Sequence, residues 1–159
     1  MIDLIYVFKF VHVAAAAAML GVWLAACLFM LFAHRSANTS VVALTARFVV
    51  QMELWVMAPA MAVTPLSGVP LAWTIGLSPL DEFWIVLSLA LYTLVLAAWL
   101  AALFLEFRIR ELAREAALAS KPLGDDYRRL FRFYAALTWP ALAGVAVLFA
   151  LMIWQPRLS

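Results

Sequence analysis

Residues 83–105 of the chain read FWIVLSLALYTLVLAAWLAALFL and contain no acidic or basic side chain. A helix needs about 20 mostly apolar residues to cross the hydrocarbon region of a bilayer. Backbone groups in lipid must find their hydrogen bonds within the protein, so only helices and closed barrels can cross. Because the apolar residues are continuous and do not alternate, the stretch predicts a transmembrane helix.

Three further apolar runs cover residues 10–33, 48–80 and 133–156. Of the 159 residues, 69% are hydrophobic and 13% are charged, whereas about a quarter of a soluble domain is charged. A water-soluble fold could not bury so much apolar surface. We therefore expect an all-α integral membrane four-helix bundle, in which residues 1–159 form a single transmembrane domain surrounded by the lipid bilayer.

The predicted helices cover about residues 5–33, 42–63, 83–120 and 128–155. The second run is too long for a simple crossing and contains four prolines, Pro59, Pro65, Pro70 and Pro79. We predict a kink near Pro59 and an irregular outer segment from residue 64 to residue 80. The third helix is expected to extend into the cytoplasm as far as residue 120, because residues 108–120 are rich in good helix formers.

Basic residues gather beside two of the three predicted connections. They are Arg35 and Arg47 after the first helix, and Arg108, Arg110, Arg114, Lys121, Arg128, Arg129 and Arg132 between the third and fourth helices. The connection after the second helix carries only Asp81 and Glu82. Since Lys and Arg are enriched in cytoplasmic loops, both termini are predicted on the outer side. We expect a multi-pass protein of the bacterial inner membrane.

Several other classes of protein are disfavoured. The sequence pI is near 9.0, but the formal net charge is only +2, and the basic residues lie where a membrane protein needs them. We therefore expect no nucleic-acid partner. The single cysteine, Cys27, lies within the first predicted helix and excludes an intramolecular disulfide framework. No phosphate-binding glycine loop is found, which disfavours a kinase.

His12 is the most informative residue of the first predicted helix. Ionisable side chains are rare in such helices and face the bundle interior, a partner or a cofactor. Neutral imidazole is a common metal ligand, and Lys9, nearly one turn away, could pair with a haem propionate. His12 is therefore the candidate metal ligand, for a haem b cofactor. The alternative is that His12 only hydrogen-bonds a neighbouring helix.

His34 is predicted to be an interfacial residue. At 1.5 Å per residue it lies roughly 33 Å from His12 along a helix, so the two cannot hold one haem within a monomer. Any second axial ligand must be a methionine, a tyrosine, water or a residue of another subunit.

Glu53 is the only carboxylate within the four apolar runs, and an unpaired charge at that depth costs several kcal/mol. Met57 and Met61 share its helix face. This stripe could line a cofactor site or a proton-accessible cavity, so Glu53, Met57 and Met61 join His12 and Lys9 as candidate cofactor-binding residues. The alternatives are a structural hydrogen bond for Glu53 and core packing for the methionines.

Polar side chains of the third and fourth helices are interpreted as groups that join helices. They are Ser88, Tyr92 and Trp99 on one face of the third helix, and Tyr134 and Thr138 on one face of the fourth.

Lys9, His12, the small-residue helix that follows and residues 28–35 resemble the start of the small bacterial membrane protoporphyrinogen oxidase family. The likeness continues through Glu53, through residues 57–60 and through the final helix at 131–156. The chain is also similar to a bacterial family of predicted four-helix integral membrane proteins of unassigned function, which shares its layout and closing proline. Both resemblances imply a four-helix membrane bundle.

The oxidase family uses a histidine of its N-terminal helix in haem binding, and His12 is the position that looks like it. That family also carries a lysine early in its third helix, where this sequence has Ser88. The resemblance therefore implies haem binding more strongly than it implies oxidase activity.

Three hypotheses follow. The first is a membrane protein that binds b-type haem and serves electron transfer or porphyrin-linked redox chemistry, as a haem-dependent oxidoreductase with a redox partner or as a homo-oligomer. The second is a non-catalytic accessory subunit or oligomeric scaffold, whose polar residues only join helices. The third is a small transporter or proton pathway that uses Glu53.

Overall fold

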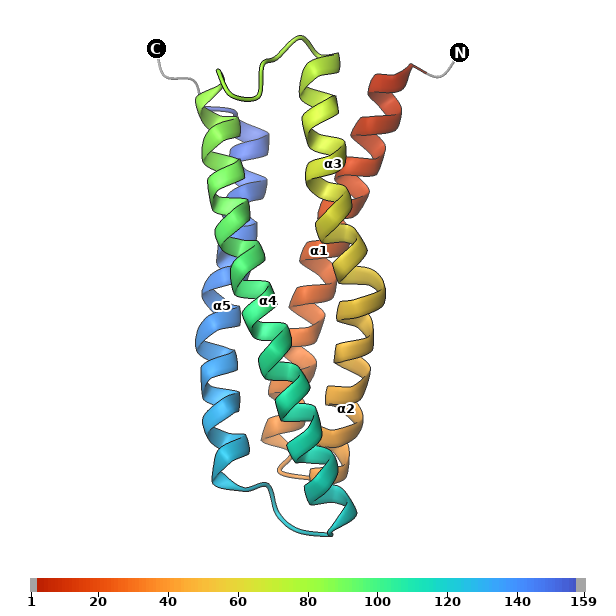
Figure 1. Ribbon diagram of the computed structural model, residues 1–159, viewed down its shortest axis with the longest axis vertical. Helices are drawn as coiled ribbons and strands as arrows, with labels where there is room; N and C mark the ends of the chain where they lie inside the picture. Colours follow the sequence, from red (N-terminus) through yellow and green to blue (C-terminus); the bar gives the residue numbers. More distant parts are fainter. Residues whose placement is uncertain (1–2, 157–159) are drawn as a thin grey trace.

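The computed structural model describes residues 3–156, and every regular element in that range is a helix. Four helical crossings follow one another along the chain. Their bounds are Leu4–Arg35 (α1), Thr39–Thr74, Phe83–Leu118 (α4) and Asp125–Trp154 (α5). Each is long and apolar enough to span a membrane, which confirms the predicted all-α membrane bundle (Figure 1).

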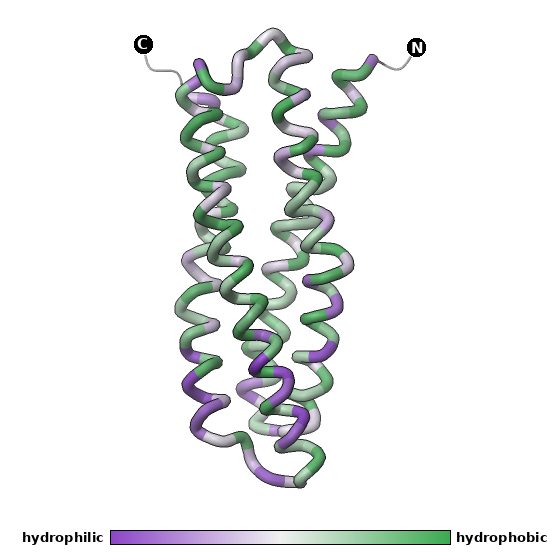
Figure 2. Tube along the Cα trace, viewed as in Figure 1, coloured by the Kyte–Doolittle hydropathy of each residue, from purple (hydrophilic) through white to green (hydrophobic). Residues whose placement is uncertain are grey.

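The two ends of the bundle differ in chemistry. The start of α1 and the end of α5 lie at one end of the bundle, together with the connection 75–82, and we call this the terminal end (Figure 1). The connections 36–38 and 119–124 lie at the opposite end, where hydrophilic residues gather (Figure 2). We call it the basic end, because Arg35, Lys121 and several further arginines lie in or beside these connections.

The second crossing consists of three segments, α2 (Thr39–Met52), η1 (Glu53–Met57) and α3 (Ala58–Thr74). The η1 segment is one π-helical turn, in which the Ala58 N–H donates to the carbonyl oxygen of Glu53, five residues earlier. Pro59 follows at once and has no N–H to donate. The irregularity predicted near Pro59 therefore takes the form of a wide turn just before the proline.

Helix α3 continues to Thr74, beyond residue 63 where the sequence analysis placed the helix end, although Pro65 and Pro70 lie inside it. Pro65 cannot donate to the carbonyl oxygen of Met61, four residues earlier. The Tyr92 hydroxyl of α4 donates a hydrogen bond to that oxygen instead. Neighbouring helices can satisfy freed backbone groups in this way. The irregular connection is therefore limited to residues 75–82.

Each helix packs mainly against one other helix, and the second crossing changes its main partner along its length. Helix α4 packs mainly against α5, α1 mainly against α3, and α2 mainly against α4. The second crossing thus packs mainly against α4 before η1 and mainly against α1 after it. Three buried clusters are found among the described residues: one around Trp23, Met57 and Val145, one nearer the basic end around Met30 and Ile109, and a small one of Ala72, Trp84 and Ile85.

Candidate functional site

The His12 ring lies against α3. Its Nδ1 atom is 2.9 Å from the carbonyl oxygen of Thr64 and 3.3 Å from Oγ of Ser67. A carbonyl oxygen can only accept, so Nδ1 carries the proton and donates it. The Ser67 hydroxyl donates its own proton to the Val63 carbonyl oxygen at 2.6 Å, which leaves its oxygen free to accept. In the neutral ring, the lone pair is therefore on Nε2.

The His12 imidazole occupies the space that a side chain on residue 68 would take, and Gly68 has none. A Cβ atom on Gly68 would lie 2.8 Å from Cε1 of His12 and 3.0 Å from its Nδ1. Any larger residue would thus collide with the ring, because real Cβ atoms are not found so close to other heavy atoms. Gly68 lies within the segment 64–80 that the sequence predicts to be irregular, because a single sequence does not show which helix faces it.

The other candidate cofactor residues separate into two groups. Lys9 is exposed on α1, one turn from His12 towards the terminal end. Met57 and Met61 are 0% and 3% exposed and pack in the core with Trp23. The methionines therefore occupy core positions.

Glu53 is 1% exposed at the π-helical turn. Its Oε2 atom accepts a hydrogen bond of 2.5 Å from the indole N–H of Trp99 on α4. Its Oε1 atom has no hydrogen-bond partner among the described residues. Since Thr64 lies eleven residues further along the crossing, about 16 Å away, Glu53 and His12 belong to separate sites.

A second buried carboxylate, Glu106 on α4, is not among the residues predicted from the sequence. The apolar run ended at Leu105, one residue earlier, but Glu106 is only 2% exposed. Its Oε2 atom has no hydrogen-bond partner in the part of the chain that the structure describes. The sequence contains one signal of this burial. Glu106 follows Trp99 by seven residues, which places the two side chains on the same face of the helix.

Further polar side chains surround the two glutamates. The Tyr134 hydroxyl on α5 lies beside Glu106 but without hydrogen-bond geometry, and it has no partner within residues 3–156. Cys27 of α1 lies next to Tyr134 and Thr138. We call Glu53, Glu106 and Tyr134 the carboxyl cluster.

His34 lies at the basic end, as expected of an interfacial residue. Its Nδ1 atom is 3.2 Å from the Tyr127 hydroxyl, and its ring stacks on Phe131 with centroids 3.9 Å apart. The two histidines are therefore held at opposite ends of α1.

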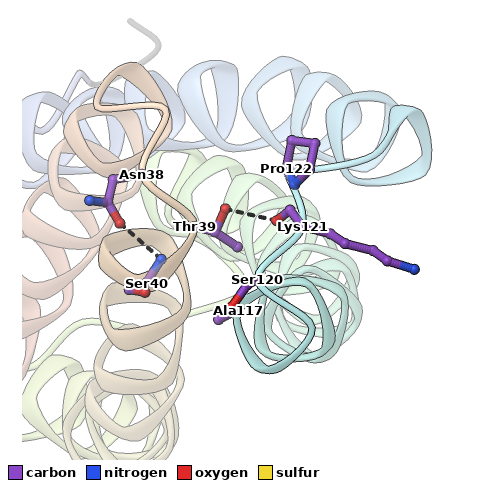
Figure 3. Close-up of a pocket in the computed structure, with 7 residues that line it drawn as sticks. All are labelled: Asn38, Thr39, Ser40, Ala117, Ser120, Lys121 and Pro122. Carbon is purple, nitrogen blue, oxygen red and sulfur yellow. Dashed lines mark hydrogen bonds between the residues drawn. The ribbon is translucent and has the colours of Figure 1, made fainter.

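A small polar pocket of about 330 Å³ lies between the two connections at the basic end (Figure 3). The Thr39 hydroxyl donates to the Lys121 carbonyl oxygen at 3.2 Å and joins the two connections. The Lys121 side chain extends away from Asn38 and Ser40 (Figure 3). Over the described residues, no group of three or more His, Cys, Asp or Glu side chains could hold a metal ion. A metal at His12 would thus need further ligands from a cofactor.

Four apolar crossings with ionisable side chains enclosed between them define a multi-pass integral membrane protein. Over residues 6–156 the sequence matches DUF2269, a family described as predicted integral membrane proteins, and the chain belongs to this family. No curated protein and no solved structure gives a significant match. Membership of a family of predicted integral membrane proteins is therefore confirmed, and the likeness to protoporphyrinogen oxidase stays a prediction.

Proposed function

We propose that this membrane protein binds a b-type haem through Nε2 of His12 and serves electron transfer or porphyrin-linked redox chemistry. The observation that carries the proposal is the 2.9 Å hydrogen bond from Nδ1 of His12 to the Thr64 carbonyl oxygen. Metal-ligating histidines almost always donate their other ring N–H to a carboxylate, a carbonyl or water, which orients the ring and raises its basicity. His12 has this arrangement, with α3 as the support.

The residues around His12 fit one side of such a site. Bound haem would supply a one-electron redox centre, and His12 would hold its iron through Nε2. Lys9 is an exposed cation one turn away, suited to a propionate. Met57 and Met61 are enclosed in the core, so any further ligand would be a tyrosine, water or a residue of another subunit. A homo-oligomer or a redox partner is therefore part of the proposal.

The proposed setting is the inner membrane of a bacterium, with the basic end in the cytoplasm. Arginines and lysines are enriched at that end, while the connection 75–82 carries only acidic charges. His12 then lies towards the outer side of the membrane.

A visible absorption spectrum of the purified protein, recorded after haem supplementation, tests the proposal. The wild type is expected to show Soret absorption that His12→Ala removes and Gly68→Ala weakens, because a Cβ at residue 68 displaces the ring. His34→Ala is the matched control and should retain the absorption, since His34 lies at the basic end. Absence of Soret absorption in the wild type, or its persistence in His12→Ala, would refute haem binding at His12.

A second candidate is a non-catalytic membrane subunit in which His12 only joins α1 to α3. The observation that favours it is that Thr64, Ser67 and Gly68 together account for the position of the ring. This function predicts that His12→Ala lowers the thermal stability of a protein that takes up no haem. Stoichiometric haem in the purified wild type would exclude it.

A further inference from the structure

The carboxyl cluster lies in the interior of the bundle, apart from His12. Glu53 comes from η1, Glu106 from α4 and Tyr134 from α5, so the cluster exists only when three crossings pack together. All three side chains are at most 2% exposed. One oxygen of each glutamate and the Tyr134 hydroxyl have no hydrogen-bond partner among residues 3–156. Buried polar atoms are nearly always paired, so three orphan oxygens in one region indicate a missing ligand.

We infer that Glu53, Glu106 and Tyr134 form an intramembrane site that binds and releases a proton. Glu53 is hydrogen-bonded to Trp99, and Glu106 follows Trp99 by seven residues on the same face of α4, about 10 Å further along the helix, so both carboxylates lie in the same part of the bundle interior. Two ionised carboxylates repel strongly in a medium of low dielectric constant, and each is also costly to bury alone. One bound proton removes the repulsion and gives one carboxyl group an O–H, which an ionised carboxylate lacks.

Among residues 3–156, no ion pair involves Glu53 or Glu106. The ion pairs found there are Arg110–Glu111, Arg114–Glu111 and Arg128–Asp125, all in partly or fully exposed positions near the basic end. The groups that face the glutamates are Trp99 of α4, Cys27 of α1 and Tyr134 of α5. None of them is a cation. Neutralisation must therefore come from a bound proton or a bound cation.

A proton fits this environment better than a metal cation. Calcium takes six to eight oxygen ligands and magnesium requires six in an octahedron. The cluster offers three orphan oxygens, and the Thr138 hydroxyl donates its proton to the Tyr134 carbonyl oxygen at 2.9 Å. A proton needs only one donor oxygen and one acceptor oxygen.

The bound proton is expected to exchange with water at the basic end of the bundle. Glu106 lies twelve residues from the end of α4 at Leu118, about 18 Å, but about 35 Å from its start at Phe83. Tyr127 lies seven residues before Tyr134 on the same face of α5, and it contacts His34. On release, the carboxyl O–H bond breaks, the proton passes to water at that end, and a carboxylate remains.

Infrared difference spectroscopy of the haem-free protein in lipid vesicles tests the inference. Near neutral pH the wild type is expected to show the C=O stretching band of a protonated carboxylic acid, and the band should shift in deuterated water. Glu106→Gln and Glu53→Gln should each remove or displace the band, because either change removes one of the two interacting carboxyl groups. Glu111→Gln, a partly exposed control on the same helix, should leave it in place.

Three outcomes would overturn the inference. The first is the absence of any protonated carboxyl band in the wild type, a result that does not depend on whether the variants fold. The second is a band that remains unchanged in the Glu53→Gln, Glu106→Gln double variant. The third is a band that added sodium or potassium abolishes at constant pH, since the cluster would then bind a metal cation. None of these results bears on His12, whose haem is tested separately.

Discussion

The replacement Gly68→Ala tests how closely α1 and α3 are fitted at His12. The new Cβ would lie 2.8 Å from Cε1 of the imidazole, whereas non-bonded carbon atoms are favourably placed at about 3.5–4.0 Å. The ring must therefore move by roughly 0.7 Å or more. Such a shift takes Nδ1 out of its 2.9 Å hydrogen bond with the Thr64 carbonyl oxygen.

The expected cost follows from three effects. Loss of a hydrogen bond costs about 0.5–1.5 kcal/mol, and overpacking costs about 1–3 kcal/mol. Alanine is the better helix former by about 1 kcal/mol, which offsets part of this loss. We expect a net loss of about 1–3 kcal/mol in the free energy of unfolding.

Denaturation in detergent micelles, followed by helical circular dichroism, measures this loss. Gly21→Ala is the matched control on α1, because no heavy atom lies within 4 Å of the Cβ it would add, and it should be neutral or stabilising by up to about 1 kcal/mol. The double variant His12→Ala, Gly68→Ala should be more stable than the sum of the two single effects predicts, since the collision partner is gone. Equal effects of Gly68→Ala and Gly21→Ala would refute the proposed fit.

The remaining predictions concern hydrogen bonds elsewhere in the bundle and use the same denaturation assay. Tyr92→Phe should lower stability by about 1–3 kcal/mol, because the Met61 carbonyl oxygen then has no donor, and an unchanged midpoint would contradict this. Trp99→Phe removes the indole N–H that donates to Glu53 and should cost a similar amount, about 1–3 kcal/mol; a neutral result would show that Glu53 finds another partner. Asn38→Ala removes the cap of α2 and should cost about 1 kcal/mol, whereas Asn38→Ser should restore most of it.

The four crossings could be predicted because each depends on properties local to the chain. Apolar length alone identifies a segment that can cross a bilayer, and no partner helix is needed to recognise it. The extent of α3 depends on more than local sequence. Pro65 leaves the Met61 carbonyl oxygen without a backbone donor, and the hydroxyl of Tyr92, far away in the sequence, donates to that oxygen instead. A rule that reads proline as a helix end cannot anticipate such compensation.

The candidate site residues also divide into those that the sequence alone identifies and those whose role depends on the packing of the helices. His12 and Glu53 were recognisable because an ionisable residue inside an apolar run is conspicuous in the sequence. Glu106 was not, because it follows an apolar run and precedes Arg108, as many solvated residues at helix ends do. Its burial depends on the packing of other crossings around α4. Likewise, the role of Gly68 in making room for the His12 ring is evident only once α1 is known to pack against it.

The π-helical turn at Glu53–Met57 has a consequence for how the second crossing tolerates change. One residue more or less in a helix rotates everything beyond it by about 100°. The π-helical turn holds one residue more than an α-helical turn, so deleting a single residue between 53 and 57 would convert it to a regular turn and leave Thr64 and Gly68 facing α1. A single-residue deletion within α2 has no such turn to absorb it and would change the facing of the outer half relative to the inner half.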